Sequence, residues 1–361
     1  MDTETGATPP SGGDAPRRRG LSRLRIALSL CLTLLFLLLL LRYVSNHLDE
    51  FKELLRRPLS RSRLSLLALA LFSVYLVNAE IFRKALRAHR VFLPFAENLS
   101  LSYATTALNY FLPFKGAVGL RALYLSRRHS LSLTDFLSQL FVISFTTLTV
   151  SSLLALPGLA LLSGGRDGGR AAFVCALYFA LVPALCLASL FSGKLQNLAP
   201  AKIKVFLSSW DRYRRNPALL GELVFWNLLY YLAWCLANHL ALGAFQVRLG
   251  PLEVFFYTSL QIHGLIINLT PAGLGVVEAA GVFAGSILDF SPAEALLAQG
   301  LSRLTAVAVL GLAGIVSWFH LLALKKAGGG SGKEAGGGVK EETDKSGKKT
   351  EGNGAEKAPR G

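Results

Sequence analysis

A short motif of asparagine, proline and glycine occurs twice in this chain, each time inside an apolar stretch. The first copy runs from Asn109 to Arg121, and the second runs from Asn268 to Glu278. Proline removes a backbone donor and glycine loosens the backbone, so each copy is expected to break a helix. Lipid cannot satisfy the backbone groups that such a break frees. Broken helices at corresponding positions in two halves of a membrane chain are typical of a transporter's binding site.

The two copies align without gaps at an offset of 159 positions. This offset pairs the following residues: Asn109 with Asn268, Gly116 with Gly275, Ser132 with Ser291, and Asp135 with Glu294. The last two pairs belong to Ser-x-x-acid patterns, which cap the start of a helix. Chance could give two apolar segments the same tip residues, but the shared caps favour an internal repeat. Its copies cover about 94–162 and 251–324.

The composition is that of a membrane protein. Hydrophobic residues make up 52% of the chain, charged residues make up 17%, and the mean hydropathy is +0.45. A helix needs about 20 apolar residues to span hydrocarbon. Blocks of this kind predict spans at 24–46, 62–82, 134–162, 171–191, 219–247 and 294–324. The stretches 98–128 and 252–289 are each interrupted by the motif, so neither is expected to be one continuous helix.

The placement of charge predicts the topology. The net charge is +16, but basic residues cluster at the ends of the spans, which indicates the positive-inside rule rather than nucleic-acid binding. We therefore expect both termini in the cytoplasm, although the basic segment after the first span does not fit this orientation. Within that segment, 47–59 is expected to be an amphipathic helix on the outer surface. The two interrupted stretches then become re-entrant hairpins that enter the membrane from opposite sides.

The predicted fold is therefore all-α: a polytopic membrane helical bundle. It combines about six full spans with two oppositely directed re-entrant hairpins that form an inverted repeat. The membrane domain is expected to cover 21–325. Residues 1–20 and the Gly/Lys/Glu-rich tail 326–361 are expected to be disordered and cytoplasmic, because their composition cannot bury a core.

Three sequence elements resemble a known family. They are Asn109-x-x-Leu-Pro113 with Arg121, the run from Pro271 to Ala279 (Pro-Ala-Gly-Leu-Gly-Val-Val-Glu-Ala), and Ser-Pro-Ala-Glu-Ala followed by Arg303. Together they resemble the lysylphosphatidylglycerol synthase transmembrane-region family, also described as flippase-like. They are also similar to the N-terminal half of the multiple peptide resistance factor. The resemblance implies lipid translocation or work in a lipid-linked glycan or hopanoid pathway. The family often has an acidic element in the helix after the first hairpin; here 139–144 is uncharged, which weakens any ion-coupling role for that helix.

The motif residues suggest a headgroup site. Guanidinium groups suit phosphate, so Arg121 and Arg303, together with Lys115, are candidate phosphate ligands. The helix N-termini after Gly116 and Gly275 would add backbone N–H donors. Glu278 is expected to pair with an arginine or to take the amine of a headgroup. The remaining candidate site residues, which shape or cap the breaks, are Asn109, Pro113, Asn268, Pro271 and Gly273.

Simpler structural roles remain open for these residues. Arg121 and Glu278 could form an ion pair that only holds the hairpins together, and Arg303 could extend toward a helix end. The two asparagines could cap the broken backbone or contact a ligand directly.

Three classes of function remain. The favoured hypothesis is a transporter of lipid or a lipid-linked intermediate in the cell (plasma or inner) membrane. The alternatives are a membrane partner or regulator of an envelope-lipid enzyme, and an enzyme acting on a lipid headgroup. No nucleophile, metal cluster or carboxylate pair stands at catalytic spacing, so we expect no enzymatic activity and no cofactor. The tail is too short for an aminoacyl-transfer domain. The expected partners are membrane lipids, and no nucleic acid.

Overall fold

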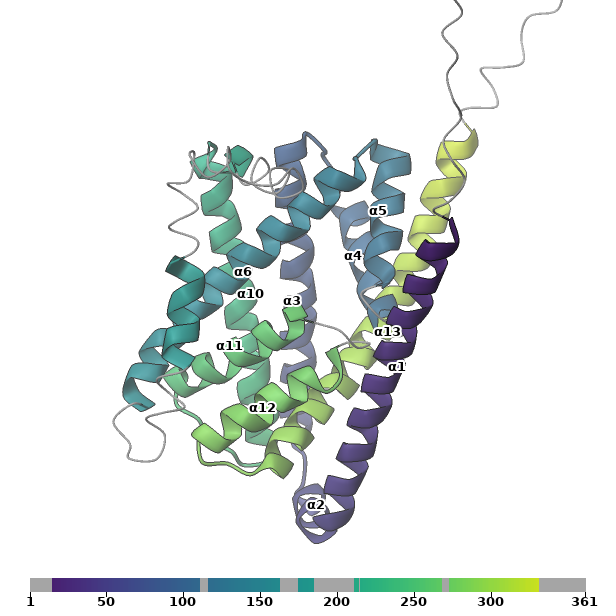
Figure 1. The fold of residues 1–361 in the computed structure, drawn as a ribbon. Helices are drawn as coiled ribbons and strands as arrows, with labels where there is room; N and C mark the ends of the chain where they lie inside the picture. The colour runs from purple at the N-terminus through teal and green to yellow at the C-terminus, as the bar shows by residue number, and fades with distance from the viewer. Residues whose placement is uncertain are drawn as a thin grey trace, which may run out of the picture. The chain divides into compact units, whose positions relative to one another are not determined.

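A computed structural model describes residues 15–110, 116–162, 175–184, 211–213, 215–267 and 273–330. Within these ranges all regular structure is helical, as the sequence predicts (Figure 1). Residues 1–321 form one compact unit, and residues 322–361 form a second. In the second unit the described part is the end of the last helix, up to Gly330.

Four helices in the described ranges are long and apolar enough to cross a membrane. They are α3 (Arg61–Leu86), α6 (Leu133–Leu162), α10 (Pro217–Ala244) and α13 (Pro292–Gly330). These helices match four of the six predicted spans. At the other two positions the described apolar helices are shorter: Thr33–Asn46, within α1 (Ala15–Asn46), and Cys175–Ala184.

Large apolar side chains lie on the outside of these helices. Leu304 on α13 is 73% exposed and Leu312 is 74% exposed, and many leucines of α1 are exposed in the same way. A soluble protein rarely exposes so large an apolar surface. This surface suits contact with lipid.

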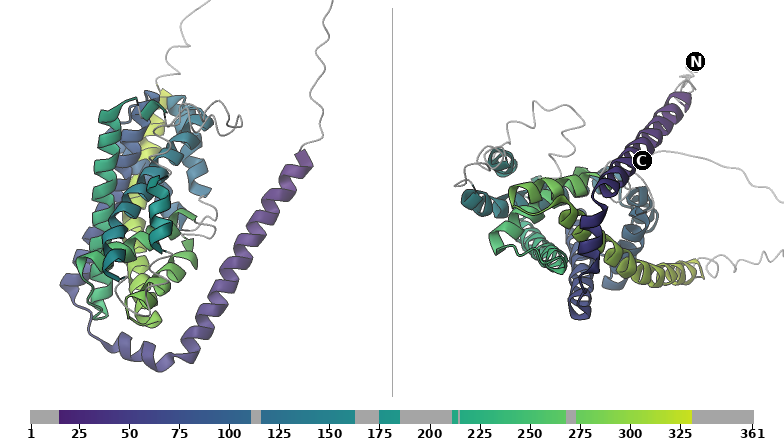
Figure 2. Two further views of the ribbon diagram at one scale, coloured as in Figure 1. Left: turned by 60° about the vertical axis from the view of Figure 1, so that its left-hand side comes forward. Right: turned by 90° about the horizontal axis from the view of Figure 1, so that it is seen from below.

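The predicted amphipathic segment forms α2 (Leu48–Arg56). Its Phe51 and Leu54 are buried, while Asp49 and Lys52 are exposed, so one face packs inward and the other is polar. Figure 2 shows α2 turning the chain from the end of α1 toward the start of α3. The helix confirms the amphipathic prediction.

Both interrupted stretches form pairs of short helices. The first pair is α4 (Phe95–Asn109) and α5 (Gly116–His129), and the second is α11 (Pro251–Ile267) and α12 (Val276–Ile287). The two helices of each pair pack against each other. Each pair is followed by a long helix, α6 or α13. The two copies of the motif therefore share one order of elements.

The predicted helix caps are present on both long helices. The backbone N–H of Asp135 donates to the Ser132 hydroxyl oxygen at 3.0 Å, and that hydroxyl donates to the Asp135 carboxylate at 2.7 Å. On α13, the Glu294 N–H donates to the Ser291 hydroxyl at 3.1 Å, and the Ser291 N–H donates to the Glu294 carboxylate at 3.0 Å. The second arrangement is a complete capping box.

Small and polar residues join the helices of the first unit. Gly158 on α6 lies against the backbone of Leu252 on α11. The Thr147 hydroxyl on α6 donates to the side-chain oxygen of Asn227 on α10 at 2.6 Å. Close glycine contacts and interhelical hydrogen bonds of this kind are typical of membrane bundles, where the hydrophobic effect does not drive helices together.

Ionic contacts gather at the helix ends that the charge pattern assigned to the cytoplasm. Asp135 contacts Arg212 at 3.0 Å and His89 at 3.2 Å, which joins the start of α6 to segments next to α3 and α10. Glu222 at the start of α10 contacts Lys84 at 3.2 Å near the end of α3.

A different set of contacts joins the segments that were assigned to the outside. Arg57, after α2, donates to the carbonyl oxygen of Phe245 at 2.9 Å, and Arg63 donates to the carbonyl oxygen of Gly243. Segments predicted to share a side of the membrane are therefore in contact at each end.

Candidate functional site

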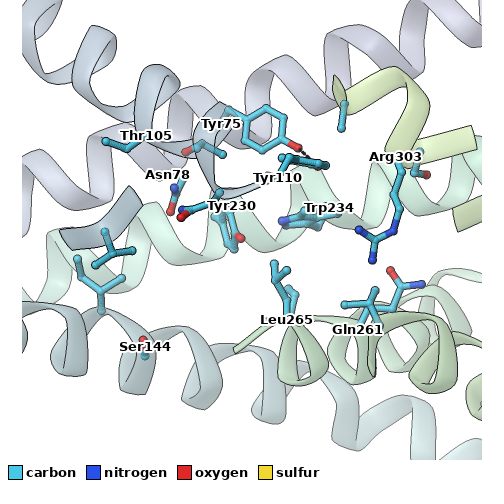
Figure 3. Close-up of a pocket in the computed structure, with 18 of the residues that line it drawn as sticks. Tyr75, Asn78, Thr105, Tyr110, Ser144, Tyr230, Trp234, Gln261, Leu265 and Arg303 are labelled. Carbon is cyan, nitrogen blue, oxygen red and sulfur yellow. Dashed lines mark hydrogen bonds between the residues drawn. The ribbon is translucent and has the colours of Figure 1, made fainter. Parts of the chain in front are cut away.

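A cavity of about 340 Å³ lies among the helices of the first unit (Figure 3). Both hairpins contribute to its wall, the first through Asn109 and Arg121 and the second through Gln261 and Val277; α13 contributes Arg303. Aromatic side chains make up much of the rest: Tyr75, Phe82, Tyr110, Tyr230 and Trp234. A mainly apolar and aromatic wall with a few polar groups is typical of a ligand site of this size.

Arg121 is the most unusual charged residue in this wall. It lies on α5 and is only 8% exposed. Its Nε donates to the Thr105 hydroxyl at 3.1 Å, and its guanidinium carbon lies 4.3 Å from the centre of the Phe82 ring. No described carboxylate lies within 4.0 Å of it. The threonine and the aromatic ring hold the guanidinium in place, but neither neutralises its charge.

Arg303 is held differently. Its Nε donates to the carboxylate of Glu278 at 2.5 Å, which links α13 to the first turn of α12. The other carboxylate oxygen of Glu278 accepts the backbone N–H of Gly275 at 2.7 Å. Glu278 therefore caps α12 and neutralises Arg303 at the same time. Its partner is Arg303 and not Arg121, which excludes the structural Arg121–Glu278 pair in this conformation.

Neutral polar side chains form another part of the wall. Gln261 on α11 and Gln299 on α13 are each 6% exposed. The amide of Gln299, the amide nitrogen of Gln261 and the buried hydroxyl of Tyr257 on α11 lie together, and none of them makes a hydrogen bond of good geometry within the described ranges. The indole nitrogen of Trp234 and the side-chain oxygen of Asn109 are also buried without a hydrogen bond of good geometry to a described residue. In Figure 3, Gln261 and Arg303 extend toward each other, with Trp234 beside them.

The structure brings three of the predicted site residues to the cavity: Asn109, Arg121 and Arg303. Glu278 is buried beside it through its contact with Arg303. The predicted glycines are at the ends of helices and do not appear among the lining residues: Gly116, Gly273 and Gly275. Pro113, Lys115, Asn268 and Pro271 lie outside the described residues.

The glycines of the second motif have a conformational role. Gly273 has a φ of 68° and Gly275 a φ of 90°, a region that residues with a Cβ rarely adopt. A Cβ on Gly275 would also lie 2.9 Å from the ring of Phe36 on α1. The two glycines therefore turn the chain into α12 and let α1 approach it.

Sequence reasoning missed several polar lining residues. Asn78, Thr105, Asn238, Gln261 and Gln299 all line the cavity. The signal that could have found them is a polar side chain inside a long apolar block, because such groups face protein or a functional cavity rather than lipid.

Comparison with known families gives a match over most of the chain. The family described as the lysylphosphatidylglycerol synthase transmembrane region matches residues 22–314. The chain belongs to this family. With four helices able to cross a membrane, this lysylphosphatidylglycerol synthase transmembrane-region protein is a multi-pass integral membrane protein of lipid metabolism or transport. The searches of curated proteins and of solved structures gave no match.

Proposed function

We propose that this chain is a flippase-like transporter, which moves a lipid or a lipid-linked intermediate across the cell membrane. The headgroup binds in the cavity between the two helical hairpins, while the acyl chains stay in the surrounding lipid. The hairpins enter the membrane from opposite sides and form an inverted repeat, and access alternates between the two faces. Both termini lie in the cytoplasm, and the chain is a transporter without enzymatic activity of its own.

The observation that carries this proposal is Arg121. A buried arginine without a carboxylate partner is costly at membrane depth, so such residues are mostly functional. Its Nε is already used by Thr105, and its Nη groups make no hydrogen bond to a described residue. These groups are available for the two oxygens of a phosphate, the geometry that a guanidinium fork suits best. The cavity has room for a headgroup and not for a whole lipid.

The test is a flipping assay in proteoliposomes that carry a phospholipid labelled on its acyl chain. Arg121→Ala is expected to slow flipping about ten-fold or more, because a charge-assisted hydrogen bond contributes about 1.5–3 kcal/mol. Arg121→Lys is expected to retain part of the rate. Arg127→Ala is the matched control, since Arg127 is exposed on the same helix and does not line the cavity.

Two results would overturn the proposal. One is Arg121→Ala protein that folds normally by size-exclusion chromatography and flips lipid at the normal rate. The other is wild-type protein that moves no lipid but co-purifies with a lipid-synthesising enzyme, which would favour the role of a membrane partner.

A further inference from the structure

The charges around the cavity restrict the headgroup that it can hold. Arg121 has no neutralising partner among the described residues, whereas Arg303 is neutralised by Glu278. The remaining described lining residues are uncharged. In the sequence, the tip segments 111–115 and 268–272 contain no Asp or Glu and one further cation, Lys115. The described wall therefore carries one uncompensated positive charge, and the tips add no acid that could neutralise it, which favours an anionic ligand.

A headgroup amine would find no free carboxylate among the described residues of this wall. Glu278 is the carboxylate next to the cavity, and both of its oxygens already accept a hydrogen bond, from Arg303 and from the Gly275 N–H. An ammonium group bound there would have to displace Arg303 from Glu278 and so separate an ion pair that lies largely out of water. Breaking a buried ion pair in this way is strongly unfavourable.

The neutral part of the wall offers donors and acceptors instead. The amides of Gln299 and Gln261 lie beside the Tyr257 hydroxyl, and with the indole N–H of Trp234 these groups make no hydrogen bond of good geometry among the described residues. A buried polar atom without a partner costs free energy, and a ligand that supplies the missing hydrogen bond recovers it. Hydroxyl groups both donate and accept, so neighbouring hydroxyls match this mixed set of atoms.

Gln299 is also held against the second hairpin. A Cβ on Gly281 of α12 would collide with the Gln299 amide nitrogen, so the absence of a side chain at Gly281 makes the room that the amide occupies. The position of this amide therefore depends on close packing between α12 and α13, and the hydroxyl of Tyr257 is its polar neighbour there.

Building on the proposed function, we propose that the cavity selects a singly charged phosphodiester headgroup that carries hydroxyls, such as a glycerol or sugar phosphate. The phosphate binds Arg121, and the hydroxyls bind the amides of Gln261 and Gln299. An aminated headgroup is disfavoured. In a family named after lysylphosphatidylglycerol, the cavity of this member then accepts the unmodified phosphatidylglycerol in preference to the lysylated lipid.

The experiment compares four lipids with the same labelled acyl chain in proteoliposomes. Phosphatidylglycerol has the charge and the hydroxyls, phosphatidylethanol has the charge alone, phosphatidylethanolamine adds an amine, and lysylphosphatidylglycerol adds cationic amines. We expect phosphatidylglycerol to flip about ten-fold faster than each of the others, which corresponds to 1.4 kcal/mol. Equal or faster flipping of either aminated lipid would overturn the proposal.

Variants of the two glutamines identify the hydroxyl site. Gln261→Leu and Gln299→Leu are expected to slow phosphatidylglycerol more than phosphatidylethanol, so that the two rates converge. A purely structural role would slow both lipids equally, and that result would overturn the assignment of the hydroxyl site.

A binding measurement separates this inference from the transport proposal. In detergent, phosphatidylglycerol is expected to raise the melting temperature more than phosphatidylethanol, and Gln299→Leu is expected to abolish the difference. If no lipid is flipped but this difference in melting temperature persists, the transport proposal is wrong and the assigned class of headgroup is retained. Soluble glycerophosphoglycerol, a singly charged phosphodiester with the same hydroxyls, is the remaining arm. A stabilisation equal to that by the lipid would assign the site to a free polyol phosphodiester and overturn the lipid assignment.

Discussion

At the scale of single residues, the contact between Glu278 and Arg303 does two things. It joins the second hairpin to α13, and among the described lining residues it leaves Arg121 as the uncompensated charge. The side chain of Glu278 is 8% exposed and that of Arg303 is 22% exposed, so the pair lies largely out of water. An ion pair in such a position is sensitive to the loss of one partner, because the other charge is then left unpaired.

We therefore expect Glu278→Gln to lower the stability of the protein by about 1–3 kcal/mol. The loss has two sources: Arg303 loses its counter-charge, and the cap on the Gly275 N–H weakens. The double variant Glu278→Gln/Arg303→Gln is expected to be more stable than the sum of the single variants implies. Thermal unfolding of the four proteins in detergent measures this coupling, and additive changes would contradict it.

Part of this site could be predicted from the sequence. Arg121, Arg303 and Glu278 stand out because charge is rare inside apolar segments, and the two motifs mark where helices break. The pairing could not be predicted, because the sequence pattern allows Glu278 to pair with either Arg121 or Arg303. Only the packing of α12 on α13 decides that Arg303 is its partner. For Gln261 and Gln299, the sequence shows polar residues but not that their helix faces point into the same cavity.

At the scale of helices, one glycine lets α6 pack closely on α11. An ideal Cβ on Gly158 would lie 2.4 Å from the carbonyl oxygen of Leu252, which is a backbone atom and cannot rotate away. The sequence predicted both helices from their apolar blocks. The sequence did not predict this contact, because a glycine inside an apolar block looks the same whether it lies against a neighbouring helix or against lipid.

Gly158→Ala is expected to force α6 and α11 apart and to destabilise the protein by about 1–3 kcal/mol. The matched control is Gly221→Ala on α10, where nothing lies within 4 Å of the added Cβ. There the helix-forming preference of alanine should leave stability unchanged or raise it by up to about 1 kcal/mol. The two melting temperatures in detergent give the comparison, and equal losses would show that Gly158 is not a packing contact.

At the scale of the whole molecule, the charge pattern and the contacts agree on which segments share an end of the bundle. Arg212 contacts Asp135 at one end, and Arg57 contacts the Phe245 carbonyl at the other. The sequence predicted these groupings because each span reverses the direction of the chain. Which end faces the cytoplasm depends on the positive-inside rule, and the basic residues after α1 oppose it.

Cysteine accessibility in intact cells tests the orientation, in a protein whose native cysteines are replaced. Arg127 and Arg212 are exposed in segments assigned to the cytoplasm, whereas Lys52 and Arg248 are exposed in segments assigned to the outside. We expect a membrane-impermeant maleimide to label cysteines at 52 and 248 in intact cells, and those at 127 and 212 only after permeabilisation. Labelling of the cysteines at 127 and 212 alone in intact cells would show that the protein has the opposite orientation in the membrane. In the proposed inverted repeat, the two hairpins would then exchange the sides from which they enter, and the cavity would be unchanged.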